Sequence, residues 1–162
     1  MIVFVTVLSF LLDGIITKYI STNTIFLPLL TVMSLIIIYP YFKEPYKYFR
    51  YCSILGILYD IVYTNTIFYN FFIFILLGLI ITFFYYIFSN RLLNTIILGF
   101  IIIIVYKFIN YVFILIIKNN NLNFKVLLTN IFNSLLLNIL FLILGFILTK
   151  YYSKKHKILR IN

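Results

Sequence analysis

The sequence has very few acidic residues, one cysteine, one histidine, and no alanine, glutamine or tryptophan. With 65% hydrophobic and 10% charged residues, the 162-residue chain has too little polar surface for a water-soluble globule. A single cysteine excludes an intrachain disulfide, and a single histidine argues against a metal site of the His/Cys type. These scarcities exclude an ordinary cytosolic enzyme, a disordered tail and a secreted disulfide scaffold. They leave an integral membrane protein, as the mean hydropathy of +1.17 also indicates.

Six apolar segments approach the length of about 20 helical residues that crosses a bilayer core of ~30 Å. They predict an all-α integral membrane protein of about six transmembrane helices with short loops. Residues 1–150 would form this single transmembrane domain, and residues 151–162 a basic cytoplasmic tail. A rival chain of five spans would lay the third segment in the membrane interface. The predicted spans are Ile2–Tyr19, Ile25–Tyr41, Tyr51–Ile67, Phe71–Phe88, Leu92–Ile117 and Leu127–Leu148.

Lysine and arginine predict the orientation, because cytoplasmic loops carry the excess of positive charge. Across six spans, nine of these residues lie on the side of the 43–50 loop and the C-terminal tail, and three lie on the other. The count therefore predicts cytoplasmic N- and C-termini. Five spans would place the N-terminus and the 43–50 loop outside, against this count.

Polar residues recur at steps of three and four within several predicted spans, which indicates faces turned toward the protein interior. Their simplest role is helix–helix contact, worth about 0.6 kcal/mol for each polar pair. The alternative is a surface that meets a partner or lines a ligand. The main stripes are Thr6, Ser9, Asp13 and Thr17; Ser53, Gly56, Asp60 and Thr64; Gly99, Lys107, Asn110 and Tyr111; and Asn130, Ser134 and Asn138.

Three ionisable residues, Asp13, Asp60 and Lys107, fall within the predicted spans. A lone charge at the bilayer centre costs at least ~2.5–3.5 kcal/mol, so one hypothesis pairs Lys107 with Asp60 or Asp13. In the alternative, the aspartates cap or hydrogen-bond locally near the outer interface while Lys107 reaches toward the headgroups. An aspartyl dyad has no supporting motif, and His156 lies among lysines of the tail. We therefore expect no enzyme, no cofactor and no metal site.

Five basic residues between Lys150 and Arg160 follow the last predicted span. Beside a membrane they interact with anionic lipids at about 1 kcal/mol for each nearby charge. A tail this short offers no folded basic surface, so we expect no nucleic-acid binding.

The segment from Gly56 to Asn70 combines a G-x-x-x-D pattern, a short polar turn and an apolar helix that begins near an asparagine. In this segment Gly56, Asp60, Tyr63, Thr64 and Asn70 resemble the motif of the rod shape-determining protein MreD family. The chain length, the hydropathy layout and the basic end of the chain agree with the resemblance.

The resemblance implies a non-enzymatic scaffold of the bacterial cell-elongation machinery, which synthesises peptidoglycan at the cytoplasmic membrane. It implies direct binding of MreC and, through it, a complex with MreB, RodA and a class B transpeptidase, without a small-molecule ligand. The partner helix is expected on the face of Gly56, Tyr59 and Asp60, or on the Asn130–Asn138 stripe.

The family is also similar in fold to the substrate-binding subunits of energy-coupling-factor transporters. The alternative function is therefore a membrane-embedded, vitamin-binding transporter subunit. Its outward pocket would bring together Asp13, Asp60, Asn70 and Lys107.

Overall fold

The computed structural model describes residues 1–19, 28–64, 66, 68–118 and 124–156, and within these ranges the chain forms helices and no strand. The predicted all-helical class is therefore confirmed. The asparagine-rich segment at 119–123, which the sequence predicts as a polar loop, and residues 157–162 of the predicted tail lie outside the described residues. The elements are α1 (Ile2–Tyr19), α2 (Leu30–Ile38), the 3-10 helix η2 (Tyr39–Tyr41), α3 (Pro45–Tyr59), the π-helix η3 (Asp60–Thr64), α4 (Tyr69–Ile87), α5 (Leu92–Lys118) and α6 (Phe124–His156).

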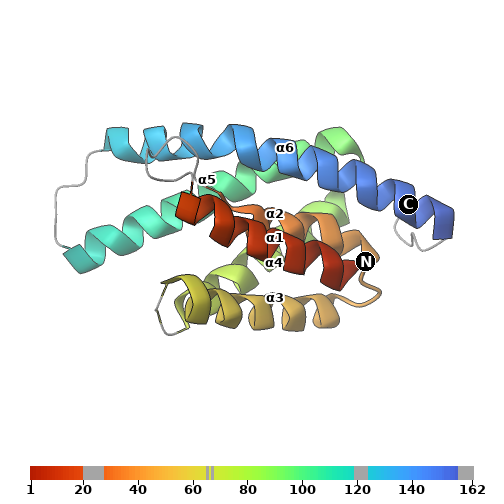
Figure 1. The fold of residues 1–162 in the computed structure, drawn as a ribbon, viewed down its shortest axis with the longest axis horizontal. Helices are drawn as coiled ribbons and strands as arrows, with labels where there is room; N and C mark the ends of the chain where they lie inside the picture. Colours follow the sequence, from red (N-terminus) through yellow and green to blue (C-terminus); the bar gives the residue numbers. More distant parts are fainter. Residues whose placement is uncertain (20–27, 65, 67, 119–123, 157–162) are drawn as a thin grey trace.

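Consecutive helices run in opposite directions along one bundle (Figure 1). Helices α1, α3 and α5 run from right to left in this view, and α2, α4 and α6 run back. The first residue of the chain and the end of α6 therefore lie at the same end of the bundle.

Four helices, α1, α4, α5 and α6, are long and apolar enough to cross a membrane. Helix α2 with η2 covers only Leu30–Tyr41. At 1.5 Å per residue this segment is roughly 18 Å long, well short of a ~30 Å bilayer core. Within the described part of the chain, four helices, rather than the six predicted, are therefore long enough to cross the bilayer core.

The second predicted span starts too early, because the helix begins at Leu30 and not at Ile25. Residues 25–27 lie outside the described part of the chain, and Pro28 and Leu29 are not helical. Proline disfavours helical geometry in the residue before it, which favours a helix start after Pro28. What remains is a short helix whose N-terminus lies inside the protein.

Helix α2 forms the centre of the bundle. All nine of its residues are buried, as expected for a helix that is apolar on every side. It packs against α1, α4, α5 and α6, and its side chains share one core with α4 and α5. Representative members of that core are Met33, Ile36, Phe74, Leu77 and Ile102.

The third predicted span differs from the structure at both ends. Helix α3 begins at Pro45 rather than Tyr51, since proline is favoured in the first helical turn, where its missing N–H costs nothing. The α-helix ends at Tyr59 and continues as η3, which ends at Thr64 rather than Ile67. A π-turn of this kind often marks a functional position.

Helix α6 extends beyond the predicted end of the last span. Its 33 residues run to His156, so the helix is roughly 50 Å long and includes the first six residues of the predicted tail. Lys150, Lys154 and Lys155 therefore lie on helical turns.

Candidate functional site

Asp60 caps the N-terminus of α4. Its carboxylate accepts hydrogen bonds from the backbone N–H groups of Asn70, at 3.0 Å, and Phe71, at 3.3 Å. The Asn70 side-chain amide and the hydroxyls of Thr64 and Thr66 also donate to it. We call Asp60, Thr64, Thr66 and Asn70 the α4 cap. Asp60 and Asn70 are 2% and 0% exposed, so the groups that donate hydrogen bonds to the Asp60 carboxylate also enclose it.

Gly56 permits the close approach that this cap requires. A Cβ atom at this position would lie 2.7 Å from both the carbonyl oxygen of Asn70 and the Cα of Phe71. Those are backbone atoms, which cannot move aside by changing rotamer. Residues four apart lie on the same face of a helix, so Gly56 contacts the start of α4 and Asp60 caps it one turn later. The G-x-x-x-D spacing therefore has a direct structural reason.

Two tyrosines of the same segment face α1. The Tyr63 hydroxyl donates to the carbonyl oxygen of Phe10, and a Cβ at Gly14 would lie 2.7 Å from that hydroxyl. Tyr59 contributes its ring, which packs edge-on against Phe10 with centroids 6.3 Å apart. Both predicted motif tyrosines thus connect η3 and the end of α3 to α1.

A second set of hydrogen bonds connects the α4 cap to α5. The Tyr106 hydroxyl donates to the side-chain oxygen of Asn70 at 3.4 Å. The Tyr69 hydroxyl donates to the side-chain oxygen of Asn110 at 3.0 Å, and Asn110 donates to the Tyr106 carbonyl. Asn110, predicted on an interior stripe, therefore helps to fix the start of α4 against α5.

Asp13 and Asn138 cap the N-terminus of α2. The two carboxylate oxygens of Asp13 accept from the backbone N–H groups of Leu30, at 2.7 Å, and Thr31, at 2.8 Å. The Thr31 hydroxyl also donates to Asp13, and the Asn138 side-chain oxygen accepts from the N–H of Leu29 at 2.7 Å. We call Asp13, Thr31 and Asn138 the α2 cap. The sequence predicted both polar stripes but not the helix start that their residues cap.

Both caps use the same physical chemistry. The first N–H groups of a helix have no partner within that helix, and they carry a partial positive charge. In a membrane no water can satisfy them, and each unsatisfied group costs several kcal/mol. A carboxylate from another helix can accept several of these bonds at once, which allows a helix to begin inside the protein.

Lys107 forms no ion pair with either aspartate in the described part of the chain. The one ion pair found there joins Lys47 and Glu44 at 3.1 Å on the surface. Lys107 is half-buried and close enough to Asp13 for an electrostatic interaction. Each aspartate instead accepts hydrogen bonds from the backbone N–H groups at a helix N-terminus.

The predicted stripe on α6 lies partly inside the bundle. Ser134 and Asn138 are fully buried, and the Asn138 amide also donates to the Ser134 carbonyl at 2.6 Å. Asn130 is half-buried two turns before Asn138. A direct partner contact through this stripe stays a prediction, as does one through Asp60.

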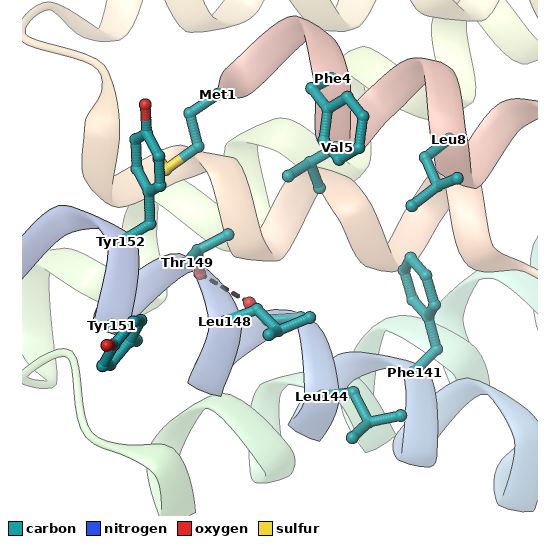
Figure 2. Close-up of a pocket in the computed structure, with 11 residues that line it drawn as sticks. Met1, Phe4, Val5, Leu8, Phe141, Leu144, Leu148, Thr149, Tyr151 and Tyr152 are labelled. Carbon is teal, nitrogen blue, oxygen red and sulfur yellow. Dashed lines mark hydrogen bonds between the residues drawn. The ribbon is translucent and has the colours of Figure 1, made fainter.

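Three of the four residues of the proposed carrier pocket, Asp13, Asp60 and Asn70, form hydrogen bonds at two separate helix starts. Asp13 faces α2, and Asp60 and Asn70 face one another at α4. A groove of about 590 Å³ lies instead between α1 and α6 and contains none of the four (Figure 2). Within the described ranges no group of three or more His, Cys, Asp or Glu residues could hold a metal ion.

Long apolar helices and internal helix starts capped by buried carboxylates define a multi-pass membrane protein of the all-helical class. The family model of the rod shape-determining protein MreD matches residues 1–155. The chain therefore belongs to the MreD family, and its role lies in the determination of rod shape.

No curated protein and no solved structure matches the chain. The similarity of fold to substrate-binding subunits of energy-coupling-factor transporters thus stays a prediction.

Proposed function

We propose that this protein is a non-enzymatic scaffold of the cell-elongation complex in the bacterial cytoplasmic membrane. It binds the transmembrane helix of MreC directly and, through MreC, joins MreB, RodA and a class B transpeptidase. Membership of the MreD family supports this role in rod shape.

The observation that carries the proposal is the apolar face beside the family motif. Ile54, Leu58, Ile61 and Val62 on α3 and η3 are 48%, 45%, 67% and 55% exposed. Behind them, Gly56 and the α4 cap fix the turn that joins η3 to α4. We assign the MreC helix to this exposed face, where Asp60 acts by positioning the face rather than by contact.

Site-specific crosslinking in membranes tests the assignment. A photoreactive amino acid at Leu58 or Ile61 should crosslink to MreC, whereas one at Leu136 or Leu140 on α6 should not. The α6 positions are matched controls because they are also apolar and 63% and 53% exposed. Crosslinks of equal yield at both faces, or none at α3, would contradict the assigned surface.

We also propose a chain that crosses or enters the membrane six times with both termini in the cytoplasm. The opposite directions of successive helices and the common end of the two termini support this topology (Figure 1). Residues 1–150 then form the transmembrane domain, and residues 151–162 extend from it as a cytoplasmic segment that begins with helical turns. A fluorescent protein fused after residue 162 should fold and fluoresce, while alkaline phosphatase fused there should be inactive. The opposite pattern would reverse the orientation.

A further inference from the structure

The N-terminal half of α1 and the C-terminal half of α6 enclose a groove of about 590 Å³ (Figure 2). Both helices pack on α2, and Ile37 of α2 lies against Gly145 of the groove. The volume falls within the ~300–1,000 Å³ of typical small-molecule pockets. Its lining includes Val5 and Leu8 of α1 and Phe141, Leu148 and Tyr152 of α6.

The groove offers an apolar, elongated space and few polar atoms. Thr149 turns its hydroxyl back to its own helix, where it donates to the Gly145 carbonyl at 2.7 Å (Figure 2). Phe4, Leu144 and Leu148 are 70%, 60% and 67% exposed along its walls. An occupant must therefore be flexible and hydrocarbon-like over most of its length.

The walls of the groove consist of side chains, with little bare backbone. The groove contains one glycine, Gly145, and its Cα faces Ile37 of α2, because a Cβ there would collide with that side chain. The remaining lining is mostly large side chains, between which an acyl chain can adapt its shape.

A positive charge lies just beyond the groove, toward the C-terminal end of α6. Lys155 follows Leu148 by seven residues and Tyr151 by four, so it lies on the same face of α6 at 100° per residue. Tyr151 is 73% exposed one turn before it. Tyrosines typically lie at the level of the lipid headgroups, and basic residues on the cytoplasmic side bind anionic headgroups.

We propose that the groove between α1 and α6 binds one anionic phospholipid. Its acyl chain lies between Leu8 and Phe141, and its headgroup phosphate lies beside Lys155 and Tyr151. The lipid fills the space that α2, a short helix, leaves open between its two neighbours.

Native mass spectrometry of the full-length protein in a mild detergent tests the proposal. The probes are phosphatidylglycerol and phosphatidylcholine with identical acyl chains. We expect the anionic lipid to bind about fivefold more tightly, equivalent to ~1 kcal/mol. Lys155→Gln should abolish this preference. Lys154→Gln is the matched control, because it removes the same charge from a position turned by about 100° around the helix, and it should keep the preference.

A second variant measures how much the groove contributes to lipid binding, independently of the charge of Lys155. Leu8→Trp fills the groove, and it should weaken binding of both lipids at least fivefold while gel filtration shows an unchanged, folded protein. Equal binding of the two lipids by the wild type, or equal effects of Lys154→Gln and Lys155→Gln, would overturn the proposal. Undiminished binding of both lipids by Leu8→Trp would likewise overturn the proposal, because the lipid would then lie outside the groove.

Discussion

The α2 cap and the α4 cap both supply hydrogen-bond acceptors to the first N–H groups of a helix, but their residues come from different distances along the chain. The α4 cap is local, because Asp60 lies ten residues before Asn70 and the intervening turn supplies the other donors. The α2 cap is assembled from three helices, since Asp13 and Asn138 meet Leu29, Leu30 and Thr31 from α1 and α6.

This difference determines what each cap stabilises. Loss of the α4 cap disturbs one junction, between η3 and α4, which lies beside the exposed turn around Phe68. Loss of the α2 cap disturbs the central helix, which packs against α1, α4, α5 and α6. Leu29, Leu30 and Thr31 are at most 3% exposed, so no water can replace the missing acceptor.

The largest effect is expected for Asp13→Ala. Three donors of α2 lose their acceptor in a buried site, which should lower the free energy of unfolding by about 3–5 kcal/mol. Unfolding by SDS in mixed micelles measures this change. Glu44→Ala is the matched control, because it removes an acid from an exposed ion pair worth at most ~1 kcal/mol. Equal effects of the two substitutions would contradict the α2 cap.

Asp60→Ala should have the second largest effect, a loss of about 2–3 kcal/mol in the same measurement. This substitution breaks more hydrogen bonds than Asp13→Ala does. However, Thr66 and Phe68 are partly exposed, so water or lipid headgroups can accept hydrogen bonds from some of the donors that are left. Asp60→Asn, which retains one acceptor oxygen, should lose less. A greater loss for Asp60→Ala than for Asp13→Ala would reverse the proposed ranking of the caps.

Gly56→Ala tests the close approach on which the α4 cap depends. Its added Cβ meets backbone atoms of Asn70 and Phe71, so we expect a loss of about 1–3 kcal/mol from overpacking. Gly99→Ala is the control, since its Cβ meets the end of the Leu142 side chain at 2.9 Å, which can rotate away. If Gly99→Ala proved the more damaging change, the reason given for the glycine of the motif would be wrong.

Thr31→Val removes one hydroxyl from the α2 cap and keeps the shape of the side chain. The Asp13 carboxylate retains both backbone donors, so a loss of about 1 kcal/mol is expected, typical of one hydrogen bond. The SDS unfolding curve again provides the measurement. A loss of stability as large as that of Asp13→Ala would mean that the hydroxyl, and not the backbone N–H groups, provides most of the stabilisation by the α2 cap.

The residues of the local cap were singled out together from the sequence, whereas those of the long-range cap were not. Gly56 and Asp60 are one helical turn apart, Asn70 follows in the same short segment, and together they match the family motif. Asp13 and Asn138 also stood out on polar stripes, but their common target could not be read from spacing. Three helices must pack before the N–H groups of α2 meet these side chains.

The lengths of the second and third spans illustrate the same limit. Hydropathy locates apolar segments, but it cannot indicate that a helix begins inside the protein at Leu30 or changes to a π-turn at Asp60. The start of α2 depends on acceptors from α1 and α6, which only tertiary structure brings together.

The most direct test of the central claim compares Lys107→Met with Asp13→Ala in the SDS unfolding assay. If the buried aspartates serve as helix caps, removal of the Lys107 charge should change the free energy of unfolding by less than about 1 kcal/mol, well below the loss for Asp13→Ala. A loss for Lys107→Met as large as that for Asp13→Ala, relieved when both substitutions are combined, would show a charge pair and contradict the capping account.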